Sequence, residues 1–185
     1  MEQENKNNSL VVIQTQGLAT ITGDQFLKDF SVAQVSKICR KINDFPAILN
    51  SGLPSLVSIG KKFGDDFILA YIEGWIVNLR EFVNVGKKMT DSQCQETAIY
   101  ILDEYFNLSI ADINLIFKNA KTGKYGPMYD HLDGQMILSW FDQHFNDRCI
   151  AAANISIREG DRFKGEGTTA SFDQIQKLYE NKRFK

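Results

Sequence analysis

The fold is decided by residues 108–148, which read LSIADINLIFKNAKTGKYGPMYDHLDGQMILSWFDQHFNDR. Apolar residues recur three or four positions apart over 110–120 and again over 137–153, and this spacing predicts two helices. Ser109 and Asp133 precede these two predicted helices and are suited to be their N-cap residues. Glycines between them interrupt the pattern. We therefore expect a short helix, a connection rich in glycine and tyrosine, and a long helix.

Working outward, capping signals start further helices at Ser31, at Asp65 or Asp66, and at Thr90. Ser31 and Thr90 are each followed three residues later by glutamine, which gives two capping boxes. Several amphipathic helices joined by short loops must pack on one another. The sequence thus predicts an all-α fold, a single-domain helical bundle.

The segment 67–83 is apolar around most of a helical circumference, which predicts a central, largely buried helix. Ala70 and Gly74 lie four residues apart on it. They leave a notch at which another backbone could approach, and such packing would offset the cost of glycine inside a helix.

The two ends of the chain differ from this middle, so we divide it into an arm (1–23), a helical domain (24–158) and a tail (159–185). The arm is flexible or extended, with β-branched residues at 10–13 and 18–21 that favour one or two short strands. It docks either within the chain or on a neighbouring subunit. The tail begins with a polar, glycine-rich linker and ends with an amphipathic helix, which docks back or binds a partner.

Composition narrows the class of protein. At 185 residues and 43% hydrophobic residues, the chain suits one domain with a substantial core. The net charge is −2, so any contact with nucleic acid must come from a local basic patch. Three cysteines, no apolar leader and no apolar run of roughly 20 residues favour a cytoplasmic protein without a membrane partner.

Catalytic and metal motifs are missing from the sequence. His131 and His144 are the only histidines, and no C-x-x-C, H-E-x-x-H, G-x-S-x-G or phosphate-loop pattern occurs. We expect His131 on the surface, His144 as a hydrogen-bonded core residue and Asp112 as an ordinary exposed carboxylate. Cys94 and Cys149 fall on predicted inward faces. We therefore expect no enzyme activity, no catalytic residue, no cofactor and no metal site.

The remaining candidate is a basic and aromatic patch around the connection in the quoted stretch. Lysines beside tyrosines can hold a phosphate backbone and stack on bases. Alternatively, the lysines complement a helix dipole and the tyrosines close the core. The candidate residues for binding a partner or nucleic acid are Lys118, Lys121, Lys124, Tyr125, Tyr129, His131 and Arg148.

Several residues also carry a resemblance: Leu108-Ser109, Asp112-Ile113, Gly123-Lys124-Tyr125-Gly126, Tyr129, Asp133-Gly134 and Arg148. Through them residues 98–148 are similar to an uncharacterised family of small helical proteins from Bacteroidetes genomes and their phages. Phe145 departs from that pattern, in which a tyrosine is expected.

More distantly, the order of helix, Gly/Lys turn and long helix ending in an arginine resembles phage replisome organisers and helicase loaders. This resemblance implies a non-enzymatic DNA-replication accessory or adaptor protein of phage or mobile-element origin. Its partner would be a replicative helicase or nucleic acid. The alternative is a phage structural or packaged protein, a homo-oligomer assembled through its arm and tail.

Overall fold

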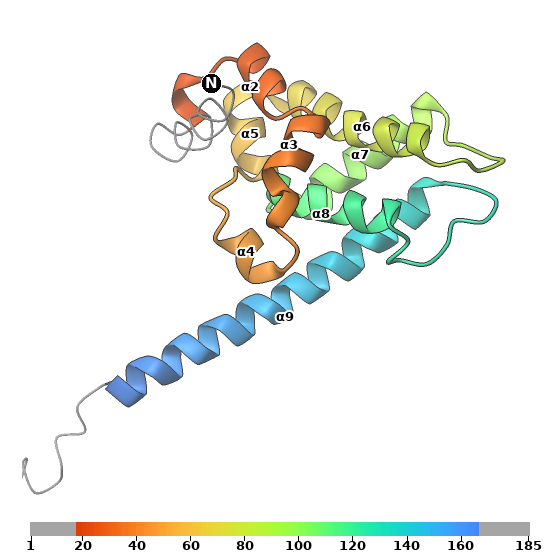
Figure 1. Cartoon of the computed structure of the whole chain (residues 1–185). Coiled ribbons are helices and arrows are strands. Elements are labelled where there is room, and N and C mark those ends of the chain that lie inside the picture. Colours follow the sequence, from red (N-terminus) through yellow and green to blue (C-terminus); the bar gives the residue numbers. More distant parts are fainter. Residues whose placement is uncertain (1–17, 167–185) are drawn as a thin grey trace, which may run out of the picture.

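The computed structural model describes residues 18–166, and over this range the chain is a helical bundle without a strand (Figure 1). The all-α prediction is confirmed. The elements in chain order are η1 (Leu18–Thr20), α2 (Gly23–Asp29), α3 (Val32–Ile38), η2 (Cys39–Lys41), α4 (Phe45–Leu49), α5 (Leu56–Phe63), α6 (Asp65–Phe82), α7 (Asp91–Tyr105), α8 (Ile110–Lys121) and α9 (Gly134–Glu166).

Helix α8 is the buried centre of the bundle. Every residue from Ile110 to Phe117 is buried, because α3, α6 and α9 all pack against this helix. We had expected α6 in this role, yet one side of α6 faces solvent at Ala70 and Gly74. A Cβ atom added to Gly74 would meet nothing within 4 Å in the described part of the chain. Among residues 18–166, nothing therefore packs into the predicted notch.

Three predicted helix starts are confirmed in atomic detail. Thr90 and Ser109 each form a complete capping box, with Gln93 and Asp112 as the reciprocal partners. The carboxylate of Asp133 accepts a hydrogen bond from the Met136 backbone N–H at 2.8 Å and so caps α9. These local signals set where α7, α8 and α9 begin.

Of the other two predicted starts, one is confirmed in position and one is wrong. Ser31 is the N-cap residue of α3, as predicted, but its side chain makes no capping hydrogen bond, so the predicted capping box does not form. The N-cap of α6 is Gly64 and not one of the aspartates that follow it. Gly64 has φ 93°, a left-handed conformation that glycine adopts without strain. It is the single residue between α5 and α6.

The sequence patterns also did not predict the short helices α2 and α4 or the 3-10 helix η1. Residues 18–20 form a 3-10 helix where we expected extended chain, and Thr22 caps α2. Proline is usually a helix breaker, but Pro46 lies in the first turn of α4, where proline is tolerated, after the N-cap Asp44.

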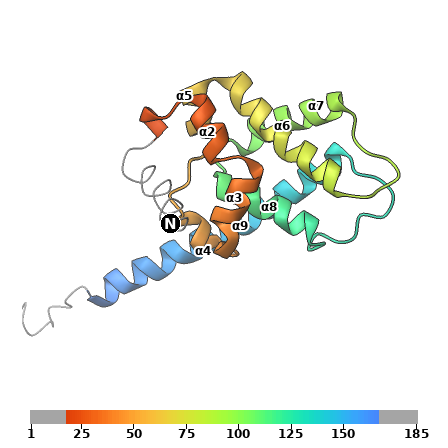
Figure 2. The same ribbon diagram turned by 45° about the horizontal axis from the view of Figure 1, so that its top comes forward.

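Helix α9 is the longest element, and its C-terminal half extends away from the body of the bundle (Figures 1 and 2). It runs to Glu166, so residues 159–166 are helical where we expected the start of a linker. The expected strand at 10–13 and the expected tail helix lie outside the described residues. The division into arm, domain and tail stays a prediction.

Candidate functional site

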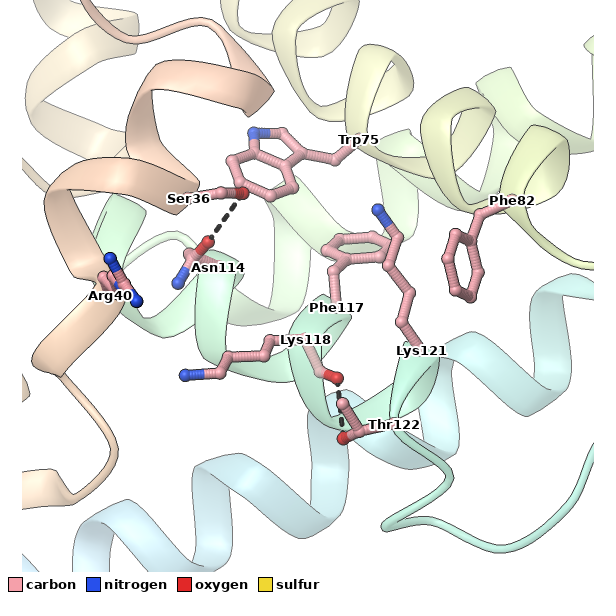
Figure 3. Close-up of a pocket in the computed structure, with 9 residues that line it drawn as sticks. All are labelled: Ser36, Arg40, Trp75, Phe82, Asn114, Phe117, Lys118, Lys121 and Thr122. Atoms are coloured by element: carbon pink, nitrogen blue, oxygen red, sulfur yellow. Dashed lines mark hydrogen bonds between the residues drawn. The ribbon is translucent and has the colours of Figure 1, made fainter.

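A pocket opens between α3, α6 and α8, with a cavity volume of ≈ 360 Å³ (Figure 3). This volume lies at the lower end of the range for ligand sites, about 300–1,000 Å³. Its lining comes from three parts of the chain that are far apart in the sequence: α3 with η2, α6, and α8 with the residue after it. The lining residues are Ser36, Arg40, Trp75, Phe82, Asn114, Phe117, Lys118, Lys121 and Thr122.

Three cationic side chains surround this pocket: Arg40 from η2 and Lys118 and Lys121 from α8. None of them forms an ion pair with a carboxylate of residues 18–166. The Lys118 ammonium donates to the Asn43 side-chain oxygen at 2.6 Å, and that of Lys121 donates to Asn78. Their partners are thus neutral amides, which leave the positive charges uncompensated. Partial burial lowers the pKa of Lys121.

An aromatic wall stands beside the cations. The rings of Trp75 and Phe117 are stacked, with centroids 5.7 Å apart, and both residues are buried. Phe82, at the end of α6, is different because 60% of its surface is exposed. The Lys121 Nζ atom lies 5.3 Å from the centroid of the Phe82 ring, a cation–π distance. Figure 3 shows the Lys121 side chain running between the rings of Phe82 and Phe117.

A second cluster of charged groups lies on the opposite part of α8, against α9. Asp112 is fully buried, with one carboxylate oxygen 2.9 Å from His144 Nε2 and 3.2 Å from Arg148 Nε. Its other oxygen accepts from the Ser109 backbone N–H at 2.9 Å and from the Ser109 hydroxyl at 2.8 Å. The ring of Phe45 lies 5.1 Å from that of His144. This buried cluster joins α4, α8 and α9.

The electrostatics of the buried cluster are governed by Asp112. Burial alone raises the pKa of this carboxyl, but hydrogen bonds from His144 and Ser109 and the charge of Arg148 lower it by more. Asp112 is therefore ionised and accepts the Nε2–H of His144. The Ser109 hydroxyl contacts Asp112 and not His144, so the cluster lacks the hydrogen bond between a nucleophile and its base. We interpret it as a structural clamp.

This cluster corrects one expectation and confirms another. We expected Asp112 to be exposed, and that expectation is wrong. The prediction that His144 is a hydrogen-bonded core residue is confirmed. The complete S-x-x-D box at 109–112 was visible in the sequence, but it did not reveal that α9 would cover the aspartate.

The seven predicted binding residues do not form one surface. Lys118 and Lys121 line the pocket, whereas Arg148 contacts the buried Asp112. Tyr125 is half-buried and stacks on Trp140 with centroids 5.5 Å apart and an interplanar angle of 10°. Burial raises the pKa of this tyrosine. Sequence reasoning missed Arg40 and Phe82 as pocket residues.

Lys124, Tyr129 and His131 lie beyond the pocket, in the loop 122–133 between α8 and α9. Lys124 is exposed, Tyr129 is 87% exposed, and the ring of His131 lies 3.3 Å from the Asp133 carboxylate. Two backbone hydrogen bonds hold this loop against the loop 83–90: Lys87 N–H donates to Asp130, and Leu132 N–H donates to Lys87, both at 3.0 Å. The two loops therefore form one end of the molecule (Figure 1).

Comparison with known proteins yields one match. The model of a family described as "Family of unknown function (DUF6633)" matches residues 88–181, which is half of the chain. The chain belongs to this family. The matched range covers α7, α8 and α9, and with them the charged groups of the buried cluster and the pocket lysines. An uncharacterised family was expected from residues 98–148, and that part of the resemblance is confirmed. No curated protein and no solved structure matches the chain.

Two features are absent from residues 18–166. Histidine, cysteine and carboxylate side chains do not gather there in threes as a metal ion would require. Within the same range, no helix combines the length and the apolar character needed to span a bilayer.

Proposed function

We propose that the protein is a non-enzymatic DNA-replication accessory or adaptor protein of phage or mobile-element origin, and that it holds nucleic-acid phosphates in the pocket between α3, α6 and α8. The observation that carries the proposal is the set of three cations, Arg40, Lys118 and Lys121, without an acidic partner in the described chain. Gathering like charges costs energy, and a bound phosphate would offset that cost. We call these three residues the pocket cations.

The helix dipole does not account for the pocket cations. Lysines in the last turn of α8 complement the negative end of its dipole. Arg40, however, comes from η2. The ammonium groups of Lys118 and Lys121 reach side-chain amides outside α8, in the loop after η2 and in α6. A chain with a net charge of −2 also contains enough acidic residues to form ion pairs with these cations. Their absence from this pocket favours an anionic ligand.

The role in replication rests on the resemblance of residues 108–148 to phage helicase loaders and replisome organisers. Accessory proteins of this kind bind a replicative helicase or DNA. The extended half of α9 supplies a second, separate surface for a helicase or another replication protein.

DNA binding is tested by fluorescence anisotropy with labelled oligonucleotides over a range of salt concentrations. Arg40→Gln and Lys118→Gln should each weaken binding and reduce the slope of log K against log salt by about 0.7–0.9. Lys28→Gln changes an exposed lysine of α2 outside the pocket and is the matched control. Affinity that does not depend on salt, or pocket variants that bind like Lys28→Gln, would refute the phosphate site. Co-purification with the replicative helicase encoded nearest to the gene tests the adaptor role, and its failure refutes that role alone.

A phage structural or packaged protein is the second candidate. Ile150 and Ile157 are 62% and 61% exposed on the extended half of α9, and they lie seven residues apart on one helical face. Such a face favours self-association. Light scattering over a range of concentrations tests this candidate, because a monomer at every concentration contradicts it. The variant Ile150→Lys, Ile157→Lys should dissociate any oligomer.

A further inference from the structure

We infer that the nucleic acid bound at this site is an unpaired strand of DNA, with a base stacked on Phe82 and the backbone continuing over the loops 83–90 and 122–133. The inference rests on the proposed function and names its ligand more closely. It depends on where the exposed aromatic rings lie relative to uncompensated cations.

Phe82 combines an exposed ring with a neighbouring positive charge. Most apolar side chains of α6 are turned into the core, whereas Phe82 is 60% exposed at the rim of the pocket. The Lys121 ammonium is held near its ring by the bond to Asn78. A base stacked on the exposed side of this ring would bring its own phosphate within reach of Lys121. Base stacking on an aromatic side chain is the usual way in which proteins hold single strands.

A duplex does not fit this geometry. Each base inside a duplex is already stacked on both faces, so an exposed phenylalanine ring gains nothing from it without unstacking a base pair. The pocket volume of ≈ 360 Å³ suits a single nucleotide and not a double helix. The site is also concave, whereas readers of duplex DNA insert a protruding helix or strand into a groove.

The path of the strand beyond the pocket follows from chain continuity. Phe82 and Lys121 are the last residues of α6 and α8, so the loops 83–90 and 122–133 both leave from the rim of the pocket. These loops are joined by the hydrogen bonds of Lys87.

The joined loops carry further groups suited to a single strand. Lys87, Lys88 and Lys124 are exposed there, and none of them forms an ion pair with another residue of 18–166. Tyr129 is 87% exposed on the same loops and offers a second ring for stacking. The pocket and the joined loops thus each carry lysines and one exposed aromatic ring.

The test compares a labelled 20-nucleotide dT strand with a hairpin duplex of equal length, using the full chain. Phe82→Leu removes the ring and keeps an apolar side chain, while Phe82→Tyr keeps the ring. Stacking is worth about 1–3 kcal/mol per base, so Phe82→Leu should bind the single strand about 5- to 150-fold more weakly. Phe82→Tyr should stay within about twofold of the original protein by the same reasoning. Tyr129→Ser and Tyr129→Phe form a second pair with the same expected contrast.

Two controls separate stacking from stability and from charge. Phe106→Leu alters another half-exposed phenylalanine, at the end of α7, and should leave binding unchanged. Phe82→Leu should leave the salt dependence unchanged, because no charge is removed, whereas Arg40→Gln lowers it. Circular dichroism checks that each variant is folded, which the exposure of Phe82 favours.

The possible outcomes separate the single-strand inference from the phosphate site on which it rests. If the duplex binds as tightly as the strand, or if Phe82→Leu binds like the original protein, the single-strand inference is overturned. A reduced salt slope in Arg40→Gln would then still support the phosphate site. If neither nucleic acid binds, both ideas are refuted.

Discussion

Removing the carboxylate of Asp112 should destabilise the protein more than a typical core substitution. In Asp112→Ala, His144 loses its hydrogen bond and Arg148 loses its ion pair. Ser109 loses the two hydrogen bonds that its backbone N–H and its hydroxyl donate to the carboxylate. Breaking a buried charge pair by deleting one partner costs about 3–5 kcal/mol, because the other charge stays buried and unpaired. Domains are stable by only about 5–15 kcal/mol in total. The variant should therefore be close to unfolding at ambient temperature.

Urea denaturation followed by circular dichroism measures this loss. A second variant, Asp112→Ala with Arg148→Met, should recover part of the stability, since it also removes the unpaired cation. The recovery separates the penalty of the unpaired charge from the loss of the cap. A cost below about 1 kcal/mol for Asp112→Ala, or no recovery in the double variant, would refute this reading of the cluster.

The loss of stability caused by Asp112→Ala should also depend on pH, and the direction of that dependence follows from the pKa of Asp112. The pKa of Asp112 in the folded chain lies below its ordinary value of 3.8, so ionisation of Asp112 stabilises the fold at any pH above that value. This contribution is lost as the pH falls through the folded pKa. The difference in unfolding free energy between the original protein and Asp112→Ala should thus be constant near neutral pH and shrink below pH 3.8.

Three further predictions concern glycines and cysteines. Gly74→Ala should raise the free energy of unfolding by about 0.5–1 kcal/mol, because the site is an exposed helix interior with open space around it; an unchanged or lower Tm would contradict this. Gly134→Ala should lower stability by about 1–3 kcal/mol, since the new Cβ would collide with the Thr97 hydroxyl; adding Thr97→Ala should restore part of it. Cys149 is exposed, so the prediction that it lies on an inward face is wrong, whereas the same prediction for Cys94 is confirmed. In the native protein only Cys149 should react rapidly with a thiol reagent, because Cys39 and Cys94 are buried and burial raises the pKa of Cys39 to about 11; fast labelling of all three thiols before denaturation would refute this burial pattern.

Much of the architecture could be predicted from residues close together in the sequence. The caps at Thr90, Ser109 and Asp133 and the apolar periods that follow them are local patterns, and the structure confirms them. The errors arose where a local signal had two outcomes. A proline can end a helix or start one, and Pro46 lies at the start of one. A glycine inside a helix can admit a neighbouring backbone or only weaken the helix, and Gly74 has open space around it among the described residues.

The candidate site was only half visible in the sequence. Lys118 and Lys121 stand three residues apart on one predicted helix, so their common direction follows from helical geometry. Arg40 and Phe82 join them only because α3, η2 and α6 pack around α8. No spacing rule connects residues that are tens of positions apart.

By itself, the sequence determined that the chain is helical, where the main helices begin and that α8 ends in lysines, because these properties depend on contacts within one or two helical turns. Only the tertiary structure decided which polar residues are buried and which cations meet. Asp112 and His144 lie 32 residues apart and are brought together by the docking of α9 on α8. That docking depends on how whole helical surfaces fit one another, which is a collective property of many side chains and not of any single motif.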